Sequence, residues 1–450
     1  MTNIALDFNK IAGVIKPMHA VNNGPVGSKV RMGNSTYEYF REAGIPYARN
    51  HDAALSDAYG GEYTVDVHRI FRNFDADPTD PASYDFECTD QCVANTFFAG
   101  TKVYYRLGAR IEHGKKVGTF PPKDFHKWAV ICEHIIRHYT EGWANGFTYD
   151  IVYWEIWNEP DCRNPDGSNP CWQGTDEEFI EFFCTAIKHL KECFPHLKIG
   201  GPAFCNVNLS RPERERLIRG LFSALRERRL SLDFFSFHRY ACVTEIFRSN
   251  IATARSLCDE YGFENAELHL NEWNYIRSFV GDDWTYSLHA EKGLKGASFT
   301  SAVMAVCQDS PLDMLMYYDA RPCGMNGMFD TDFLTPLKGY YPFKFFGELY
   351  RMGEFVRPEY TESPIYVTAA RGEDAAGVML TNYDEDDAAP AQEVVLTMRG
   401  VEGKMASIYM LDQTHDATLI EGVVLGESLT LTVPLHAVCF VKIEDHQSET

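Results

Sequence analysis

Two short segments of the sequence each place a glutamate among tryptophan and asparagine residues. The first covers residues 154–161 (Trp-Glu-Ile-Trp-Asn-Glu-Pro-Asp) and contains Glu159, and the second covers residues 269–274 (His-Leu-Asn-Glu-Trp-Asn) and contains Glu272. The two glutamates are 113 positions apart. Two carboxyl groups that face one pocket can divide acid and base work, because one can be held protonated while the other stays ionised.

A carboxyl pair lined by aromatic and amide side chains suits the cleavage of a glycosidic bond. The protonated carboxyl group gives its proton to the leaving oxygen, and the ionised one attacks the anomeric carbon or activates water. Aromatic rings offer flat apolar faces to sugar C–H groups, and Asn, His and Tyr side chains hydrogen-bond to hydroxyls. Such a substrate would account for part of the aromatic content, which is 14%.

The elements expected around the two glutamates support this interpretation. Over the first 350 residues short apolar segments alternate with amphipathic helical ones, which is typical of a parallel sheet with helical crossovers. We expect eight strands, at residues 11–18, 45–49, 102–107, 153–157, 198–200, 232–237, 267–271 and 312–318. Because no Gly-rich dinucleotide fingerprint follows the first strand, an α/β fold of the (β/α)₈ TIM-barrel type is favoured. Both glutamates then lie at the C-terminal ends of strands, where such barrels hold their active sites.

The pattern of the sequence changes after about residue 352. Val- and Thr-rich segments without helical signals occur at residues 365–369, 377–381, 393–398, 406–411, 428–433 and 437–443. Short strands at this spacing indicate an antiparallel β-sandwich. We therefore expect a catalytic barrel at residues 11–352 and a β-sandwich domain at residues 353–450, which a strand within residues 1–10 can join. The acidic loop at residues 384–387 is expected to be a solvated turn.

Glu155 is expected to have a structural role. By strand alternation it shares a face with Trp157 and Glu159 and lies deeper in the barrel. Since fully buried carboxylates are rare unless they are paired, an ion pair with an arginine is favoured over a third catalytic acid.

Residues 155–161 resemble the acid/base motif of glycoside hydrolase clan A, and more narrowly of family 39, which contains β-xylosidases and α-L-iduronidases. Three further segments resemble the same family: residues 47–52 (Tyr-Ala-Arg-Asn-His-Asp), 237–240 (Phe-His-Arg-Tyr) and 409–416 (Tyr-Met-Leu-Asp-Gln-Thr-His-Asp). The resemblance covers most of the chain and implies a retaining hydrolase that has a clan A barrel and a β-sandwich.

The resemblance also implies roles for single residues. Glu159 would be the acid/base and Glu272 the nucleophile, while Asn158 would contact the hydroxyl next to the anomeric centre and Arg49 would lie near the nucleophile. Other residues follow strand ends and are expected to contact the sugar: His51, Asp52, His238, Tyr240, Trp273, Asn274, Trp157 and Asp319. His19, Asn22 and Arg321 are weaker candidates of the same kind.

Two segments depart from the family pattern. Residues 271–274 are Asn-Glu-Trp-Asn where a Thr-Glu-Phe-Asn-like run is expected, and residues 19–25 (His-Ala-Val-Asn-Asn-Gly-Pro) match neither the iduronidase nor the usual xylosidase pattern. Because these residues lie where the glycone is bound, they leave the sugar open. An α-L-arabinofuranoside, or an arabinose-containing disaccharide unit, is as plausible as a xyloside.

No metal and no cofactor are expected. Metal-dependent barrel enzymes bring several His ligands together, typically through a His-x-His after the first strand, and His19 stands alone there. Cys88 with Cys92, and Cys162 with Cys171, are the only close pairs in loop-like sequence. Neither is accompanied by a second pair at finger-like spacing, which argues against a structural zinc.

The composition limits the classes of molecule that the protein is expected to bind. The formal net charge of −22 disfavours nucleic acids and anionic membrane surfaces, and no apolar run approaches the length of a membrane span. No signal peptide is visible, and thirteen cysteines then indicate reduced thiols, so we expect a cytoplasmic protein, either monomeric or homo-oligomeric. Such a location favours exo action on short glycosides. A transglycosidase, or a carbohydrate-binding barrel without hydrolytic activity, remains an alternative.

Overall fold

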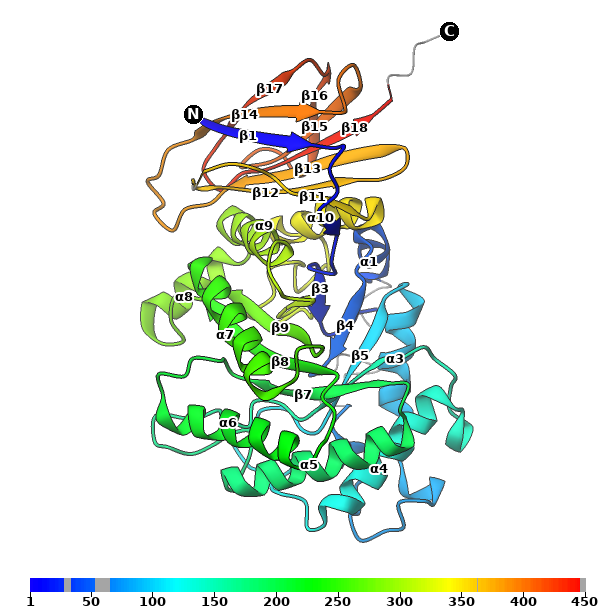
Figure 1. Ribbon diagram of the computed structural model, residues 1–450. Coiled ribbons are helices and arrows are strands. Elements are labelled where there is room, and N and C mark those ends of the chain that lie inside the picture. The colour runs from blue at the N-terminus through cyan, green and yellow to red at the C-terminus, as the bar shows by residue number, and fades with distance from the viewer. Residues whose placement is uncertain (28–33, 53–64, 362, 446–450) are drawn as a thin grey trace.

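Eight parallel strands close into a barrel in the computed structural model, which describes residues 1–27, 34–52, 65–361 and 363–445 (Figure 1). The strands follow chain order around the barrel, and β10 pairs with β3 to close it. They are β3 Ala20–Asn22, β4 Tyr47–Asn50, β5 Lys102–Leu107, β6 Tyr153–Ile156, β7 Lys198–Phe204, β8 Phe234–Ala241, β9 Glu267–Tyr275 and β10 Met314–Tyr317. The predicted (β/α)₈ barrel is confirmed.

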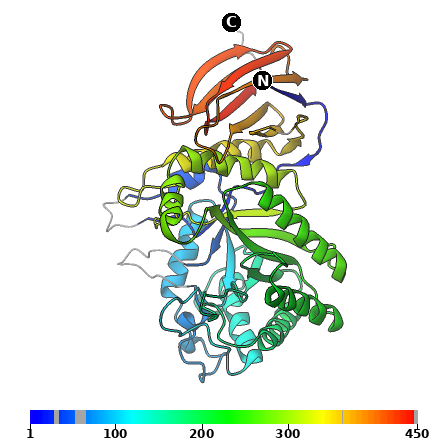
Figure 2. The same cartoon turned by 90° about the vertical axis from the view of Figure 1, so that its left-hand side faces the viewer.

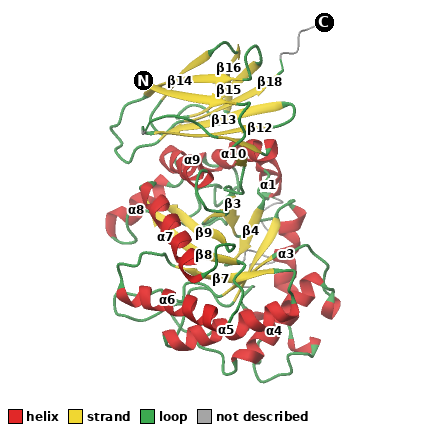
Figure 3. Ribbon diagram, viewed as in Figure 1, coloured by secondary structure: helices red, strands yellow, loops and turns green. Residues whose placement is uncertain are grey.

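Helices surround these strands, as Figure 3 shows. Those in the described part of the chain are α1 Tyr37–Ala43, α2 Val67–Ile70, α3 Glu87–Phe98, α4 Phe125–Thr140, α5 Asp176–Cys193, α6 Pro212–Glu227, α7 Glu245–Tyr261, α8 Gly281–Ala290, α9 Leu294–Gln308 and α10 Tyr341–Met352. A capping box precedes α5: the Thr175 side chain accepts from the Glu178 backbone N–H, and the Glu178 side chain accepts from the Thr175 backbone N–H. Such reciprocal bonds satisfy two helix-end donors and fix where α5 begins.

The first predicted strand, at residues 11–18, is wrong. The barrel strand at this position is β3, which begins at Ala20. Residues 12–15 instead run beside residues 353–356. The Ala12 N–H donates to the Phe355 carbonyl and the Ile15 N–H to the Gly353 carbonyl, and β2 (Gly13–Val14) pairs with β11 (Glu354–Val356). An apolar run alone does not reveal which sheet it joins, because strand pairing is decided by distant segments.

The C-terminal strands form two sheets that face each other across an apolar core (Figure 2). The larger sheet has the order β16-β15-β18-β13-β12-β11-β2 and is antiparallel throughout, and the smaller has the order β1-β14-β17. The β1 strand is parallel to β14 and buries Ile4 and Leu6. The bounds are β1 Thr2–Asp7, β11 Glu354–Val356, β12 Ile365–Arg371, β13 Ala375–Asn382, β14 Gln392–Arg399, β15 Met405–Leu411, β16 Thr418–Val424, β17 Ser428–Val433 and β18 Val438–Glu444. The predicted β-sandwich is confirmed.

Helices α9 and α10 lie between the barrel and the sandwich (Figure 1). All residues of α9 from Lys295 to Gln308 are buried. This burial explains why the α9 sequence has no continuous charged face, since a helix with no solvent-facing side needs no polar stripe.

The acidic loop at residues 384–387 is a turn with Asp386 and Asp387 exposed, as expected, but it also contacts the barrel. Glu385 accepts from the Tyr275 hydroxyl at 2.9 Å and from the Arg277 guanidinium. Lys295 donates to Asp387 at 2.7 Å. The loop therefore binds the sandwich to the end of β9 and to α9.

Two further features concern the chain as a whole. Within the described residues, every helix is too short or too polar to cross a lipid bilayer. All thirteen cysteines are free thiols.

Candidate active site

The two glutamates singled out in the sequence meet at the C-terminal end of the barrel. Glu159 follows β6 and Glu272 lies on β9, and His238 of β8 lies between them. The His238 Nδ1 atom is 2.9 Å from Glu159 Oε1 and 3.5 Å from Glu272 Oε2. One oxygen of each carboxyl group and this nitrogen all lie within 4.8 Å of one another. The Glu159 and Glu272 side chains keep 14% and 10% of their surface exposed, so a substrate can reach both.

An unusual backbone conformation turns Glu159 into the barrel. Trp157 has φ 76° and Glu159 has φ 47°, and non-glycine residues seldom adopt this left-handed region. The Glu159 N–H donates to Ala203 of β7 at 2.9 Å, and the Cys162 N–H donates to the Glu159 carbonyl at 3.0 Å. Local strain of this kind persists only where surrounding contacts hold it, and it gathers at functional sites.

Arg49 hydrogen-bonds to four polar side chains of the site. Its guanidinium is fully buried and donates to Glu155 Oε2 at 2.7 Å, to Glu272 Oε2 at 3.2 Å and to Asn158 Oδ1 at 2.7 Å. A fourth bond, from Nη1 to Asn22 Oδ1, is 3.0 Å long. Arg49 therefore lies beside Glu272, as the family resemblance implies, and orients the Asn158 amide.

Glu155 has the structural role predicted for it. Besides the ion pair with Arg49, its carboxylate accepts from the Ser236 hydroxyl at 2.6 Å and from the Asn271 amide. Its side chain is fully buried. A buried carboxylate with this set of partners is compensated, and it is out of reach of a substrate.

Burial favours the protonated forms of both glutamates. Burial raises the pKa of Glu159 well above its ordinary value, and the nearby Cys162 and Asp161 add to the effect. The pKa of Glu272 is raised to about 7, because burial and the nearby Glu159 outweigh the opposing effects of His238, Arg49 and the Tyr240 hydroxyl, which lies 2.5 Å from Oε1. Two carboxyl groups with different pKa values are the arrangement that separates an acid from a nucleophile.

The His238 ring is fully buried. Burial lowers the pKa of its imidazole, although the Glu272 carboxylate opposes the effect. A neutral imidazole between the two carboxyl groups can hydrogen-bond to them without adding a charge to the site.

A second polar group occupies the neighbouring side of the barrel end, after β4 and β10. Asp52 accepts from the Tyr318 hydroxyl at 2.6 Å, and Asp319 accepts from the Asn23 amide at 2.8 Å and pairs with Arg321. His51 is held by Arg106, whose Nε is 3.2 Å from its Nδ1. Burial lowers the pKa of His51 and raises that of Asp319 to about 6. The predicted residues His51, Asp52 and Asp319 thus lie together.

Three predicted sugar contacts are wrong. Trp157 packs outward against Trp128 and Phe182 of the helical layer, and Trp273 packs against Phe247, Phe299 and Tyr317. Asn274 uses its amide on the backbone of Tyr318 and Met325. The left-handed turn at Trp157 breaks the two-residue alternation, and Trp273 and Glu272 are neighbours on one strand and so face opposite sides.

The weaker candidates divide between the site and the outer layer. His19 does not reach the site, because it bonds Gly44 and packs on Phe346 and Tyr350. Asn22 and Arg321 do belong to it. Asn23 and Tyr318 also belong to the site but were not predicted from the sequence. Asn23 follows the first expected strand and Tyr318 ends the eighth, and a polar side chain at such a position is the signal that could have identified them.

Aromatic rings extend from the Tyr240 side chain beside Glu272 toward the surface. The Tyr240 ring meets the Phe279 ring edge to face at 5.3 Å, and Phe279 stacks with Trp284 of α8 at 5.7 Å. Phe279 is 56% exposed. We call Tyr240, Phe279 and Trp284 the aromatic strip. Phe279 and Trp284 lie at the surface after the end of β9. The local sequence pattern gives no sign that they lie near the site.

The carboxyl pair with His238 has the spacing of three metal ligands. However, Glu272 already accepts from Tyr240 and Arg49. The positive charge of Arg49 lies 3.2 Å from its carboxylate and would repel a cation there. The geometry is therefore better suited to proton transfer and nucleophilic attack than to ligating a metal.

Comparisons with known proteins agree with this geometry. A sequence profile described as glycosyl hydrolases family 39 matches residues 41–272, about half of the chain, and the match ends at Glu272. A curated protein named Beta-xylosidase, from Geobacillus stearothermophilus, is 24% identical over 261 residues, which is 51% of this chain and 47% of that protein. The match thus spans about half the length of that relative.

Two solved structures share the whole architecture. A glucosidase from Croceicoccus marinus aligns with a TM-score of 0.81 and 20% identity, over 99% of this chain and 100% of that one. An α-L-arabinofuranosidase from Thermotoga maritima aligns with a TM-score of 0.70 and 13% identity, over 99% and 100% of the two chains. At these identities the likeness establishes the fold.

Proposed function

Because the chain belongs to glycosyl hydrolase family 39, we propose that it is a retaining glycoside hydrolase that acts in exo fashion on short oligosaccharides or glycosides. Glu159 is the acid/base and Glu272 the nucleophile. The small carbohydrate is the only partner that the reaction needs, apart from water.

The single observation that carries the proposal is the spacing of the two carboxyl groups. Retaining enzymes hold the groups about 5–5.5 Å apart so that one can attack the sugar directly, and inverting enzymes leave about 6.5–9.5 Å for a water molecule. Here the nearest carboxyl oxygens of Glu159 and Glu272 lie within 4.8 Å. This spacing supports the two-step mechanism.

In the first step Glu272 attacks the anomeric carbon while Glu159 gives its proton to the leaving oxygen. Arg49 donates a hydrogen bond to one oxygen of the Glu272 carboxylate and Tyr240 donates to the other, and these two bonds fix the orientation of the attacking group. In the second step Glu159, now ionised, takes a proton from water, and that water releases the sugar from Glu272. The raised pKa of Glu159 favours its protonated form at the start of the cycle.

The glycone is proposed to be a β-xyloside or an α-L-arabinofuranoside. The names of the curated relative and of one structural neighbour support these two sugars, and the name of the other neighbour adds a glucoside as a third. Asn158, His51, Asp52 and Asp319 supply the polar groups that would bind the sugar hydroxyls. We further propose a cytoplasmic location and an accessory role for residues 353–450, which brace the barrel through α9 and the loop at residues 384–387.

The test combines a panel of nitrophenyl glycosides with proton NMR of the first-formed anomer. Activity on one glycoside with retention of configuration is expected. Glu272→Ala should abolish it, and Glu159→Ala should lose it but regain part with azide, which needs no general base. Glu155→Gln is the matched control and should not respond to azide. Inversion, or full activity in either alanine variant, would overturn the proposal, and a glycan that binds without being cleaved would favour a carbohydrate-binding protein.

A further inference from the structure

A cluster of thiols lies directly behind the carboxyl group of Glu159. The Glu159 carboxylate and the sulfurs of Cys162 and Cys205 lie within 4.8 Å of one another. The sulfur of a third cysteine, Cys171, is 3.9 Å from Glu159 Oε2. We call Cys162, Cys171 and Cys205 the thiol cluster. Cys162 and Cys205 are both partly exposed.

The fold holds the thiol cluster in place. The Cys162 N–H donates to the Glu159 carbonyl at 3.0 Å, and the Cys205 N–H donates to Asp161 Oδ1 at 2.8 Å. Asp161 is itself paired with Arg214 at 2.6 Å and is buried. Two segments that are distant in the sequence, one after β6 and one after β7, are therefore fixed with their sulfurs facing the same carboxylate.

The donor atoms gathered here are three sulfurs and a carboxyl oxygen, from Cys162, Cys171, Cys205 and Glu159. A thiolate rather than a thiol is the form that ligates a metal. Sulfur and carboxylate donors at this spacing are typical ligands of Zn²⁺ and of softer divalent ions.

We propose that Cys162, Cys205 and Glu159 bind a thiophilic divalent cation such as Zn²⁺ or Cd²⁺, with Cys171 near enough to add a further thiolate, and that the bound ion inhibits the enzyme. Each thiol that ligates the ion releases its proton to solvent, and the ion takes up the carboxyl oxygen that would otherwise carry the catalytic proton. Binding of the ion stands by itself, whereas inhibition rests on the proposed acid/base role of Glu159.

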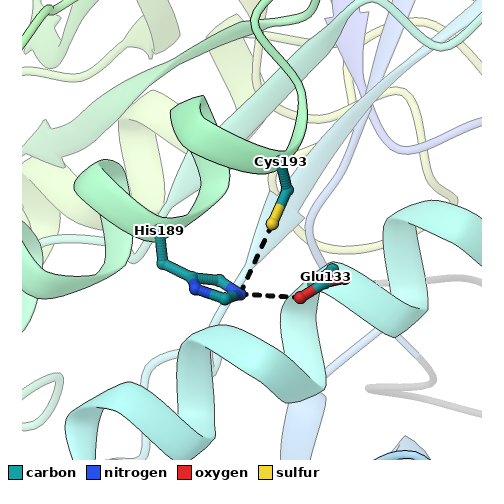
Figure 4. A group of neighbouring side chains, drawn as sticks. All are labelled: Glu133, His189 and Cys193. Carbon is teal, nitrogen blue, oxygen red and sulfur yellow. Dashed lines mark hydrogen bonds and ion pairs between the residues drawn. The ribbon is translucent and has the colours of Figure 1, made fainter.

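A second cluster with a thiol provides an internal comparison. Figure 4 shows Glu133 of α4 with His189 and Cys193 of α5. There a single nitrogen, His189 Nε2, makes both contacts, at 2.7 Å to Glu133 and 3.7 Å to Cys193. Glu133 is also paired with Arg137. With one thiol and a neighbouring guanidinium, this cluster is the weaker cation site and supplies the control variant.

The test uses the full chain after chelator treatment, titrated with Cd²⁺. The first readout is the ultraviolet thiolate-to-cadmium charge-transfer band, which does not depend on activity, and the second is hydrolysis of the best glycoside with and without the ion. In the unsubstituted protein the band and the inhibition should rise together and be reversed by EDTA. Cys162→Ser and Cys205→Ser should each weaken the apparent Cd²⁺ affinity by about tenfold or more, and Cys193→Ser should not change it.

Further measurements keep the proposal falsifiable if a serine variant folds poorly. In the unsubstituted protein Cd²⁺ should slow the alkylation of Cys162 by iodoacetamide, followed by mass spectrometry, and should leave that of Cys193 unchanged. Unchanged titrations of Cys162→Ser and Cys205→Ser, or loss of the band in Cys193→Ser, would overturn the site. A band without inhibition would retain the site and overturn the assignment of Glu159.

Discussion

Arg49 forms a shorter ion pair with Glu155 than with Glu272, at 2.7 Å against 3.2 Å. Glu155, which has no proposed chemical role, therefore shares the positive charge of Arg49 with Glu272, the proposed nucleophile. Since Glu155 offsets part of the positive charge of Arg49, the pKa of Glu272 is less depressed than an unshared guanidinium would make it, and burial raises it to about 7.

Glu155→Gln should therefore change both stability and pH dependence. Removing one partner of a buried ion pair leaves an uncompensated charge, which costs about 3–5 kcal/mol of the free energy of unfolding. The unshared charge of Arg49 should also lower the pKa of Glu272 and move the acid limb of kcat/KM to lower pH. Urea unfolding and a pH profile check the two effects, and an acid limb that moves upward would contradict the account.

The pH profile of kcat/KM is expected to be bell-shaped. Activity should rise as pH increases through about 7, because Glu272 attacks only when it is ionised and its pKa is about 7. It should fall at higher pH where Glu159 loses its proton, since burial raises the pKa of Glu159 well above its ordinary value. Initial rates at low substrate concentration across the pH range measure both limbs.

Tyr240→Phe should shift the acid limb upward. The Tyr240 hydroxyl donates to Glu272 at 2.5 Å and stabilises the ionised form. A hydrogen bond to a charged group is worth about 1.5–3 kcal/mol, which corresponds to a rise of about one to two pH units in the limb. Tyr318→Phe is the matched control, because it removes a hydroxyl bonded to Asp52 rather than to Glu272. Equal shifts in the two variants would argue against a specific effect of Tyr240.

Trp284→Ala should weaken the binding of aromatic or extended aglycones. The aromatic strip runs from Tyr240 to Trp284 on the exposed side of the site. An aromatic stacking contact is worth about 0.5–1.5 kcal/mol, so KM for an aryl glycoside should rise by up to about tenfold, while KM for the methyl glycoside stays the same. Phe98, 63% exposed at the end of α3, provides the control variant Phe98→Ala. Equal effects on the aryl and methyl glycosides would exclude the strip as an aglycone site.

Glu291 should make the protein less stable as pH rises. Its carboxyl group is buried and forms no ion pair with any of the described residues, and burial raises its pKa to about 9. The folded state keeps the proton that the unfolded chain loses above about pH 4.5. Stability should fall between these values by up to about 1.4 kcal/mol per pH unit. Glu291→Gln should flatten this slope in thermal melts at pH 5–8.5, and an unchanged slope would show that other groups cause it.

Much of the site could be predicted from the sequence because its key residues are fixed by strand order. Glu159, Glu272, Arg49 and Glu155 all lie on or just after barrel strands, and parallel strands bring those ends together. Strand alternation also correctly placed Glu155 inside the barrel.

Other parts could not be predicted because they depend on backbone detail or on tertiary pairing. Trp157 faces outward because of its left-handed φ of 76°, which no local residue pattern indicates. The Cys162 and Cys171 pair had no second pair nearby in the sequence, and Cys205 joins it only because β7 lies next to β6. Residues 11–18 were assigned to the barrel because an apolar run does not specify the sheet it enters.

The contact between Glu385 and Tyr275 limits how freely this enzyme could be rebuilt. Tyr275 is three residues beyond Glu272 on the same strand, and its hydroxyl is held by a loop that belongs to the sandwich. A designer who fused this barrel to a different accessory module would remove the support at the end of β9, the strand that carries Glu272. Residues 384–387 would have to be transplanted with the barrel, which makes the two parts a single unit for protein engineering.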